Sequence, residues 1–492
     1  MDRMKKSFLL GRLSLLLSGV LMMLSPAAEK PNIVFIITDD QSADAVAASK
    51  LWGAETSGLQ TPHLDRLYQN GTVFRQAYNM GAWHGAVCVA SRSMLMTGRF
   101  VWNTRAQEKS KFSDMLAREK TWSQRMKRAG YTTYLSGKWH VEADAKKIFD
   151  HTANIRPGMA PTVPESYKRP VEGKKDNWNP ADPQTRGLWT GGKHWSEVLA
   201  DDAESFVKQA AGEKKPFFLY LAFNAPHDPR QAPQSWLDQY PVETIPIPEN
   251  FLPLNPHRAI MGMEKANGSG VLRDEQLAPF PRTEFAIRTH RKEYFALISH
   301  TDEQIGRIIK ALEKAGVANN TMIVFTSDHG LAIGRHGLMG KQSMYEHSLR
   351  VPFVMSGPHI PQGKVIDERI YLQDAVATSL DIAGADREGI DFKSLLPLMK
   401  GDAKKHYDAI YGAYEMGSQR AVIDGKDKLI LYPRDRVALL FDLEKDPLEK
   451  NAITESPDSE IVKKRLFAKL LAWQKKNADP LDLTVFYPQW LP

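Results

Sequence analysis

Carboxylate side chains stand directly behind two apolar runs of this chain. Asp39 and Asp40 follow one run, and Asp328 and His329 follow another. Like charges within a few ångströms raise one another's pKa, so three carboxylates in one place stay ionised only around a cation. Oxygen ligands favour Ca²⁺, with Mg²⁺ or Mn²⁺ next, and the imidazole of His329 leaves Zn²⁺ open as well. If these groups meet in the fold, we expect a divalent metal site.

The chain has one cysteine, Cys88, which excludes an intramolecular disulfide and offers one thiol nucleophile. A helix is predicted to start at Ser91, so Cys88 would lie near its N-terminus and beside Arg92, in positive potential. A lone cysteine is more often an inert core residue than a reactive one. The residues around Cys88 must therefore decide its role.

Four segments that end in polar residues are predicted as strands. Each is a continuous run of β-branched and aromatic residues, which is typical of strands covered by helices on both faces. The four segments are 32–38, 132–136, 217–223 and 322–327.

Helices are expected between these strands at 62–70, 122–128 and 301–314, each followed within two residues by a glycine. This alternation predicts an α/β fold, a large and mostly parallel mixed sheet flanked by helices.

Ligands of such sheets bind beyond the carboxyl ends of the strands. Taken singly, each polar cluster would more often be a helix cap or a turn. If the strands are neighbours, these side chains converge: Asp39, Asp40, Lys138, His140, His227, Asp328 and His329.

The residues around the cysteine carry a resemblance to a known family. Residues 88–92, Cys-Val-Ala-Ser-Arg, and 97–99, Thr-Gly-Arg, resemble the sulfatase signature, Cys-x-(Pro or Ala)-Ser-Arg with a Thr-Gly-Arg tail. The chain is identified as a type I, formylglycine-dependent sulfatase of the alkaline phosphatase superfamily, similar to arylsulfatases and iduronate-2-sulfatase. The resemblance runs from about Pro31 to the last helix, with counterparts at 137–140, 225–227, 327–330, 336–341 and 440–447.

The resemblance implies an alkaline phosphatase-like fold with a smaller C-terminal α+β subdomain. It also implies that a formylglycine-generating or anaerobic sulfatase-maturating enzyme converts Cys88 to formylglycine (3-oxoalanine), which acts with Ca²⁺, or with Mg²⁺ or Mn²⁺. The implied metal ligands are Asp39, Asp40, Cys88, Asp328 and His329. The implied catalytic residues are Cys88, Arg92, Lys138, His140, His227 and Lys341.

The resemblance implies a role in sulfate ester hydrolysis for each of these catalytic residues. Arg92, Lys138 and Lys341 stabilise negative charge on the sulfuryl group. His227 or Lys341 protonates the leaving oxygen, and His140 takes a proton from residue 88.

Two departures from the family pattern bear on this assignment. Ala90 stands where many members have proline, which leaves open which maturation enzyme recognises the motif. His329 stands where many members have asparagine, and this leaves the metal preference open.

The predicted chain organisation is a signal peptide at 1–27, a catalytic domain at 28–400 and a C-terminal subdomain of a small antiparallel sheet plus a helix at 401–492. Lys5 and Lys6 precede an apolar stretch, and Ser25 and Ala27 supply the small residues of a cleavage site. We therefore expect export to the periplasm or the medium. An uncleaved membrane anchor is the less favoured reading, because the apolar run is short for a membrane span.

The predicted substrate is a sulfated carbohydrate, either a polysaccharide or a glycosaminoglycan-derived oligosaccharide. The loop-rich segments 150–194 and 228–289 are expected to carry the specificity. The candidate sugar contacts are Trp83, His84, Arg156, Lys193 and His194.

Two alternatives share much of this pattern. A phosphatase or phosphonate monoester hydrolase of the same superfamily would share the metal carboxylates, but the Cys-x-Ala-Ser-Arg motif favours the sulfatase. A catalytically inactive glycan-binding relative would normally have lost a carboxylate or the nucleophile, and here every position is filled. A net charge of +7 over 492 residues is too mild to indicate nucleic acid binding. The oligomeric state is left open.

Overall fold

The four segments predicted as strands lie next to one another in an eight-stranded sheet. A computed structural model describes residues 30–52, 58–213, 215–261, 272–415 and 418–491, and its large sheet has the order β13-β2-β12-β10-β1-β9-β5-β6. The four central strands are parallel. They are β10 (Thr321–Ser327), β1 (Asn32–Thr38), β9 (Phe217–Ala222) and β5 (Thr132–Lys138).

The outer strands make the sheet mixed. β6 (His151–Arg156) continues the parallel order beside β5, whereas β12 (Phe353–Ser356) runs antiparallel to β10. β2 (Thr72–Phe74) pairs antiparallel with β12, and β13 (Lys364–Ile366) pairs parallel with β2. The predicted α/β class with a large, mostly parallel mixed sheet is therefore confirmed.

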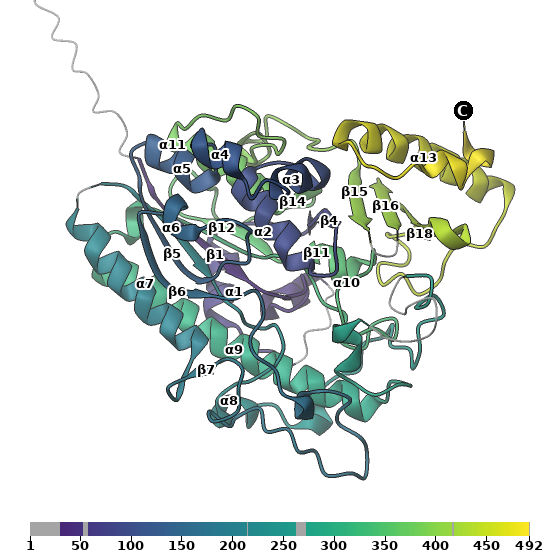
Figure 1. The fold of residues 1–492 in the computed structure, drawn as a ribbon, viewed down its shortest axis with the longest axis horizontal. Helices are drawn as coiled ribbons and strands as arrows, with labels where there is room; N and C mark the ends of the chain where they lie inside the picture. The colour runs from purple at the N-terminus through teal and green to yellow at the C-terminus, as the bar shows by residue number, and fades with distance from the viewer. Residues whose placement is uncertain (1–29, 53–57, 214, 262–271, 416–417, 492) are drawn as a thin grey trace, which may run out of the picture. The chain divides into compact units, whose positions relative to one another are not determined.

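Helices cover both faces of this sheet, as the apolar runs require. Alternate residues of β1 point to opposite sides: Phe35 packs in the core beneath α5 and α11, and Ile36 packs in the core beneath α1, α7 and α9. Figure 1 shows α7 and α9 running along one side of the sheet and α5 and α11 on the other. These helices are α1 (Pro62–Asn70), α5 (Trp122–Arg128), α7 (Trp195–Gly212), α9 (Glu284–Lys314) and α11 (Asp374–Ala383).

Two of the three predicted helices have the expected bounds, and one does not. The expected helix at 301–314 is only the last part of α9, which begins at Glu284, where the side chain of Thr283 accepts a hydrogen bond from the Ala286 amide. The first half of α9 was missed because it buries charged residues in ion pairs, such as Glu293 with Arg169. Its sequence therefore lacks a simple apolar stripe.

A second sheet, at the C-terminal end, has the order β18-β17-β16-β15-β4. Four of its strands are antiparallel, and α13 (Pro457–Asn477) packs against them. The fifth strand, β4 (Gly81–Ala82), comes from the region just before Cys88 and pairs parallel with β15. Residues 31–492 form one compact unit, so the predicted boundary at 400/401 stays a prediction. The antiparallel strands are β15 (Ile410–Tyr414), β16 (Gln419–Asp424), β17 (Asp427–Tyr432) and β18 (Val437–Asp442).

The remaining elements are short, except for α2 (Val87–Thr97), which carries Cys88. The other helices are α3 (Val101–Glu108), α4 (Ser113–Ala117), α6 (Ala145–Ile148), α8 (Gln234–Leu237), α10 (Glu346–Leu349) and α12 (Leu396–Lys400). The other strands are β3 (Ala77–Tyr78), β7 (Trp189–Thr190), β8 (Lys193–His194), β11 (Arg350–Val351) and β14 (Ile370–Tyr371).

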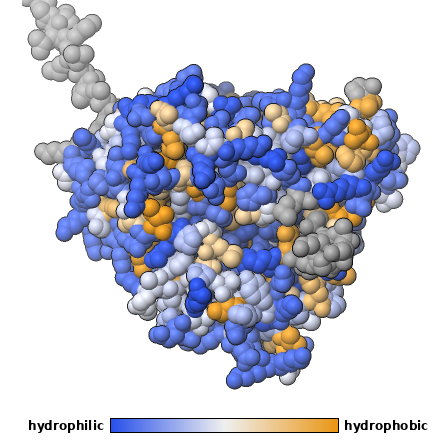
Figure 2. Space-filling view, in the orientation of Figure 1, coloured by the Kyte–Doolittle hydropathy of each residue, from blue (hydrophilic) through white to orange (hydrophobic). Residues whose placement is uncertain are grey.

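The predicted signal peptide at 1–27 lies outside the described residues. Within the described part of the chain, none of the helices is both long and apolar enough to span a membrane. The face of the molecule in Figure 2 carries mostly hydrophilic side chains, with apolar ones in small groups between them.

Candidate active site

The polar residues that follow the four central strands meet at one edge of the sheet. Asp40 follows β1, and its backbone amide donates to Asp328 Oδ1, which follows β10, at 3.3 Å. Lys138 ends β5, and His227 stands five residues beyond β9. All four side chains are at most 5% exposed. The convergence expected from parallel neighbouring strands is therefore present.

Cys88 joins this cluster from α2. The helix begins at Val87, four residues before the predicted start at Ser91, so Cys88 lies in its first turn. Its Sγ is 3.3 Å from His329 Nε2 and 3.6 Å from Lys341 Nζ.

Electrostatics favour the anionic form of the Cys88 thiol. Burial alone would raise the pKa of this thiol, but the charges of Lys138, Lys341 and His329 outweigh burial and hold that pKa well below 9.0. Cys88 is thus a buried sulfur surrounded by charged side chains, unlike an inert core cysteine.

Cationic side chains pair with each of the three carboxylates. Lys138 Nζ donates to Asp39, and Arg92 Nε donates to Asp328 Oδ2 at 2.9 Å. Lys341 Nζ donates to both oxygens of Asp40, at 2.7 and 2.9 Å. Through these pairs the three carboxylates hold three cations in place near Cys88, and all of these side chains are buried.

The carboxylates also leave room for a metal ion. Asp39 Oδ1 is buried without a hydrogen-bond partner, and Arg92 Nη2 is 4.0 Å away. Burial, and next the charges of Asp328 and Cys88, raise the pKa of Asp39 well above 3.8. A buried carboxylate oxygen with no partner is costly, and a bound cation would relieve that cost.

The ligand atoms available for such an ion are close together. One atom each from Asp39, Cys88, Asp328 and His329 lie within 4.8 Å of one another, and the same holds for Asp39, Asp40, Cys88 and His227. His329 Nδ1 faces two acceptors at 3.1 Å, the Gly330 carbonyl and Asp40 Oδ1. Nδ1 therefore carries a proton, and Nε2 faces the site, where it would give up its own proton to bind a metal ion. Oxygen ligands with one imidazole fit a divalent cation.

A network of hydrogen bonds and ion pairs that sequence reasoning missed connects His227 with Lys341. His227 Nδ1 donates to the Asp228 carbonyl oxygen at 2.7 Å, which directs Nε2 toward Asp40. Arg273 Nη2 donates to Asp228 Oδ1 at 2.9 Å and to Asp274 Oδ1 at 2.6 Å. Asp274 Oδ2 lies 3.9 Å from Lys341 Nζ. Arg273 and Asp274 follow no predicted strand, so no local signal in the sequence could have found them.

Of the five predicted sugar contacts, His84 is the one beside the cysteine. It is half-buried, and burial lowers the pKa of its imidazole while the nearby Cys88 charge raises it. Trp83 is only 6% exposed and packs in the core, where its Nε1 donates to Glu108 at 2.6 Å. Arg156 stacks its guanidinium on Trp195 at 4.5 Å from the ring centroid.

The structure contradicts the prediction for His194, and Lys193 stays a prediction. His194 is fully buried as the N-cap of α7: its Nδ1 accepts from the Ser196 amide and its Nε2 donates to the Gln231 carbonyl. Both ring nitrogens are occupied, so the prediction that His194 contacts substrate is wrong. Lys193 pairs with Asp201 of α7, which also binds Arg307 of α9, so its ammonium is engaged on the outside of this helix pair.

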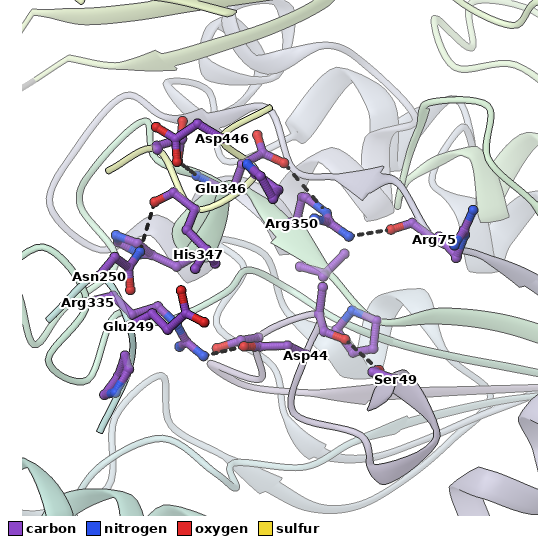
Figure 3. Close-up of a pocket in the computed structure, with 18 of the residues that line it drawn as sticks. Asp44, Ser49, Arg75, Glu249, Asn250, Arg335, Glu346, His347, Arg350 and Asp446 are labelled. Atoms are coloured by element: carbon purple, nitrogen blue, oxygen red, sulfur yellow. Dashed lines mark hydrogen bonds and ion pairs between the residues drawn. The ribbon is translucent and has the colours of Figure 1, made fainter. Parts of the chain in front are cut away.

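A cavity of about 570 Å³ lies outside this cluster, and none of the cluster residues lines it. Figure 3 shows its charged side chains, with Arg335 and Asp44 pointing toward one another. Lys450 pairs in the same way with Glu249, at 3.5 Å. Size alone therefore does not identify the site, because Cys88 and the carboxylates around it lie elsewhere.

The chain matches two family models that together cover most of its length. A model described as Sulfatase matches residues 31–385. A second, described as N-sulphoglucosamine sulphohydrolase, C-terminal, matches residues 334–476. The first match spans the whole Cys88 cluster, and the second contains the four antiparallel strands of the C-terminal sheet.

Individual relatives agree with these matches. An arylsulfatase of Clostridium perfringens is 29% identical over 474 residues, which cover 89% of this chain and 92% of that protein. An N-acetylglucosamine-6-O-sulfatase of Bacteroides thetaiotaomicron is 25% identical, with 92% of this chain and 87% of that protein covered. A solved structure of a protein in complex with its substrate, D-glucosamine-2-N,6-O-disulfate, superposes with a TM-score of 0.70 at 23% identity. It covers 92% of this chain and 99% of that one, and it shows the shared fold.

Proposed function

This chain belongs to the sulfatase family of sulfuric ester hydrolases, and from that premise we propose that it is an exported enzyme acting on a sulfated carbohydrate. The proposal includes formylglycine made from Cys88 and a divalent metal ion. The observation that carries it is the place of the one cysteine: Cys88 Sγ lies 3.3 Å from His329 Nε2 and 3.6 Å from Lys341 Nζ, among three buried carboxylates.

Asp39, Asp40, Asp328 and His329 would hold the metal ion. When bound, the ion and the formylglycine together supply an activated oxygen nucleophile at neutral pH. The unpartnered Asp39 Oδ1 supports a cation at this place. Ca²⁺ is proposed first because the carboxylate oxygens dominate the ligand set, with Mg²⁺ or Mn²⁺ as the alternatives.

Three side chains of the protein itself would bind and stabilise the sulfuryl group. Lys341, Lys138 and Arg92 surround residue 88, and each is held by a carboxylate partner, so their positions are set before substrate arrives. Preorganised positive charge of this kind stabilises negative charge that develops on sulfuryl oxygens in the transition state.

Proton transfer is assigned to the side chains whose orientation the fold controls. His227 keeps one proton on Nδ1, bound to the Asp228 carbonyl, so a second proton would sit on Nε2 and could pass to the leaving alcohol oxygen. Lys341 is the alternative donor. His140 is the proposed base at residue 88: burial and the neighbouring Lys138 lower the pKa of its imidazole, which keeps it neutral and able to accept a proton.

The carbohydrate part of the proposal is supported by two relatives. One is named for the 6-O-sulfate of N-acetylglucosamine, and a structural neighbour was solved with a glucosamine disulfate. Export is proposed from the signal peptide predicted at 1–27. N-terminal sequencing of the exported protein is expected to show cleavage after Ala27, and an N-terminus at Met1 would contradict it.

The decisive experiment is the mass of the peptide containing residue 88, from protein made with a formylglycine-generating enzyme. An aldehyde in place of the thiol supports the proposed nucleophile, and an unmodified thiol in active protein overturns it. A substrate panel then compares sulfated monosaccharides and oligosaccharides with an aryl sulfate and an aryl phosphate. Activity confined to aryl sulfate would count against the carbohydrate, and faster phosphate turnover would favour a phosphatase of the same superfamily.

A further inference from the structure

The imidazole of His140 is placed with little help from hydrogen bonds. His140 lies two residues beyond β5 with a left-handed backbone, φ 49°, and its Nδ1 is buried without a hydrogen-bond partner. The ring interacts with Cys88, whose own position is fixed by α2. Packing must therefore supply the rest of the constraint on this ring.

That packing comes from Gly158. A Cβ atom added at Gly158 would lie closer than 3.0 Å to Cδ2, Nε2 and Cε1 of His140, a separation that real Cβ atoms essentially never show. The backbone of Gly158 does not have positive φ, so its conformation suits any residue. What requires a glycine here is the space that the imidazole occupies.

The turn that carries Gly158 is anchored on three sides. The Trp139 amide donates to the Arg156 carbonyl at 3.2 Å, which ties the turn to the end of β5. Asn224 Nδ2 donates to the Pro157 carbonyl at 3.2 Å, which ties it to the loop after β9. The guanidinium of Arg156 rests on Trp195 of α7. Of the two groups in contact, the imidazole is therefore the one that can move.

We propose that Gly158 is a positioning residue for His140, whose imidazole rests on the bare backbone of this glycine and is thereby set relative to residue 88. The inference rests on the proposed function, in which His140 accepts a proton at residue 88. Misplacing a reacting group by about 1 Å costs about 100-fold in rate. Gly158 touches no reacting atom and acts only through the ring.

The first test compares Gly158→Ala with Gly212→Ala in matured enzyme. Gly212 ends α7, has no atom within 4 Å of an added Cβ and has no positive φ, which makes it a matched control. Gly158→Ala is expected to lower kcat for an aryl sulfate about 100-fold, with KM and the melting temperature close to wild type. Gly212→Ala is expected to leave kcat, KM and the melting temperature unchanged. Equal kcat in the two variants would overturn the proposal.

A double-mutant cycle separates positioning from a general structural role. In His140→Ala protein the space beside Gly158 is vacant, so adding Gly158→Ala is expected to leave the residual rate unchanged within about twofold. An equal loss in both backgrounds would mean that Gly158 acts on something other than His140.

A third readout does not depend on activity. In the unmatured, metal-free protein, the His140 imidazole resonance is identified by its loss in His140→Ala. This resonance is expected to shift in Gly158→Ala and to stay unchanged in Gly212→Ala. An unchanged resonance in Gly158→Ala would contradict the contact between Gly158 and the His140 imidazole. If wild type hydrolyses no sulfate while this resonance still shifts, the proposed function fails and the contact between Gly158 and His140 stands.

Discussion

Two regions of this molecule gather charged side chains, and they differ in how deeply their ion pairs are buried. In the cavity of Figure 3, Arg335 pairs with Asp44, and Arg350 Nε lies 3.6 Å from Glu346. In the Cys88 cluster, the buried atoms Asp39 Oδ1 and Arg92 Nη2 have no hydrogen-bond partner. The cavity also retains buried atoms without a hydrogen-bond partner, among them Arg350 Nε and His347 Nε2, so such atoms do not separate the two regions. The difference is burial of the ion pairs: the side chains of Arg335 and Asp44 are 11% and 30% exposed, whereas those of Lys341 and Asp40 are 3% and 1% exposed. Deep burial of charge around a nucleophile, rather than cavity size, distinguishes the Cys88 cluster.

Replacing Cys88 gives the largest expected difference between the regions. Cys88→Ala is expected to lower sulfate ester turnover by at least about 10⁴-fold, because it removes the group that becomes the nucleophile. Steady-state turnover of an aryl sulfate is the measurement. In the cavity, Asp44→Asn is the matched change and should leave turnover within about twofold. Equal losses in the two variants would erase the distinction between the regions.

Removing the metal ion is expected to give wild type a pH dependence of stability that Asp39→Asn lacks. The pKa of Asp39 is raised in the fold, by burial and then by Asp328 and Cys88, so the folded state binds more protons than the unfolded state above 3.8. Stability from this group is therefore lost as the pH rises from 3.8 through the folded pKa. Relative to Asp39→Asn, chelated wild type is therefore expected to lose free energy of unfolding as the pH rises above 3.8.

Urea unfolding of both proteins with chelator provides this measurement, and added Ca²⁺ should cancel the loss in wild type alone. A constant difference in the free energy of unfolding between the two proteins across the pH range would contradict a raised pKa of Asp39 in the fold.

Breaking the network behind His227 should have an intermediate effect. Asp228→Asn keeps the carbonyl that orients His227 but removes the charge near His227 Nδ1, 3.3 Å away, and the partner of Arg273. We expect kcat/KM to fall about tenfold, because the loss of this charge weakens both the pair with Arg273 and the contact that helps to position His227 as a proton donor. Steady-state kinetics would detect this, with Glu249→Gln at the cavity as the matched control. Unchanged kcat/KM would mean that the network only supports the fold.

The smallest effect is expected at the cavity pair itself. Arg335→Ala removes the partner of Asp44, and the two side chains are 11% and 30% exposed. Partly exposed pairs contribute little, so the free energy of unfolding should fall by about 1 kcal/mol or less. The kinetic constants should not change. A large loss of turnover would give the cavity a role in catalysis and weaken the comparison.

The parts of the fold that could be predicted are those with a strong local signal. β1, β9, β5 and β10 are runs apolar on both faces, and α5 was predicted with its observed bounds because Gly130 stops it. α9 was predicted 17 residues too short because buried ion pairs interrupt its apolar stripe. His194 was misread as a sugar contact because a histidine that caps a helix cannot be told by sequence from one that faces a ligand.

What the sequence determined by itself is therefore the chemistry available at the strand ends: three carboxylates, one cysteine in a recognisable motif, and the lysines and histidines around them. These are local properties, read from residue types and short spacings. The tertiary structure alone decided which groups touch, because contacts such as Arg273 with Asp228 and Gly158 with His140 join segments that sequence periodicity does not relate. It also decided that Asp39 Oδ1 is buried without a partner, since burial is a property of the packed chain and of no single segment.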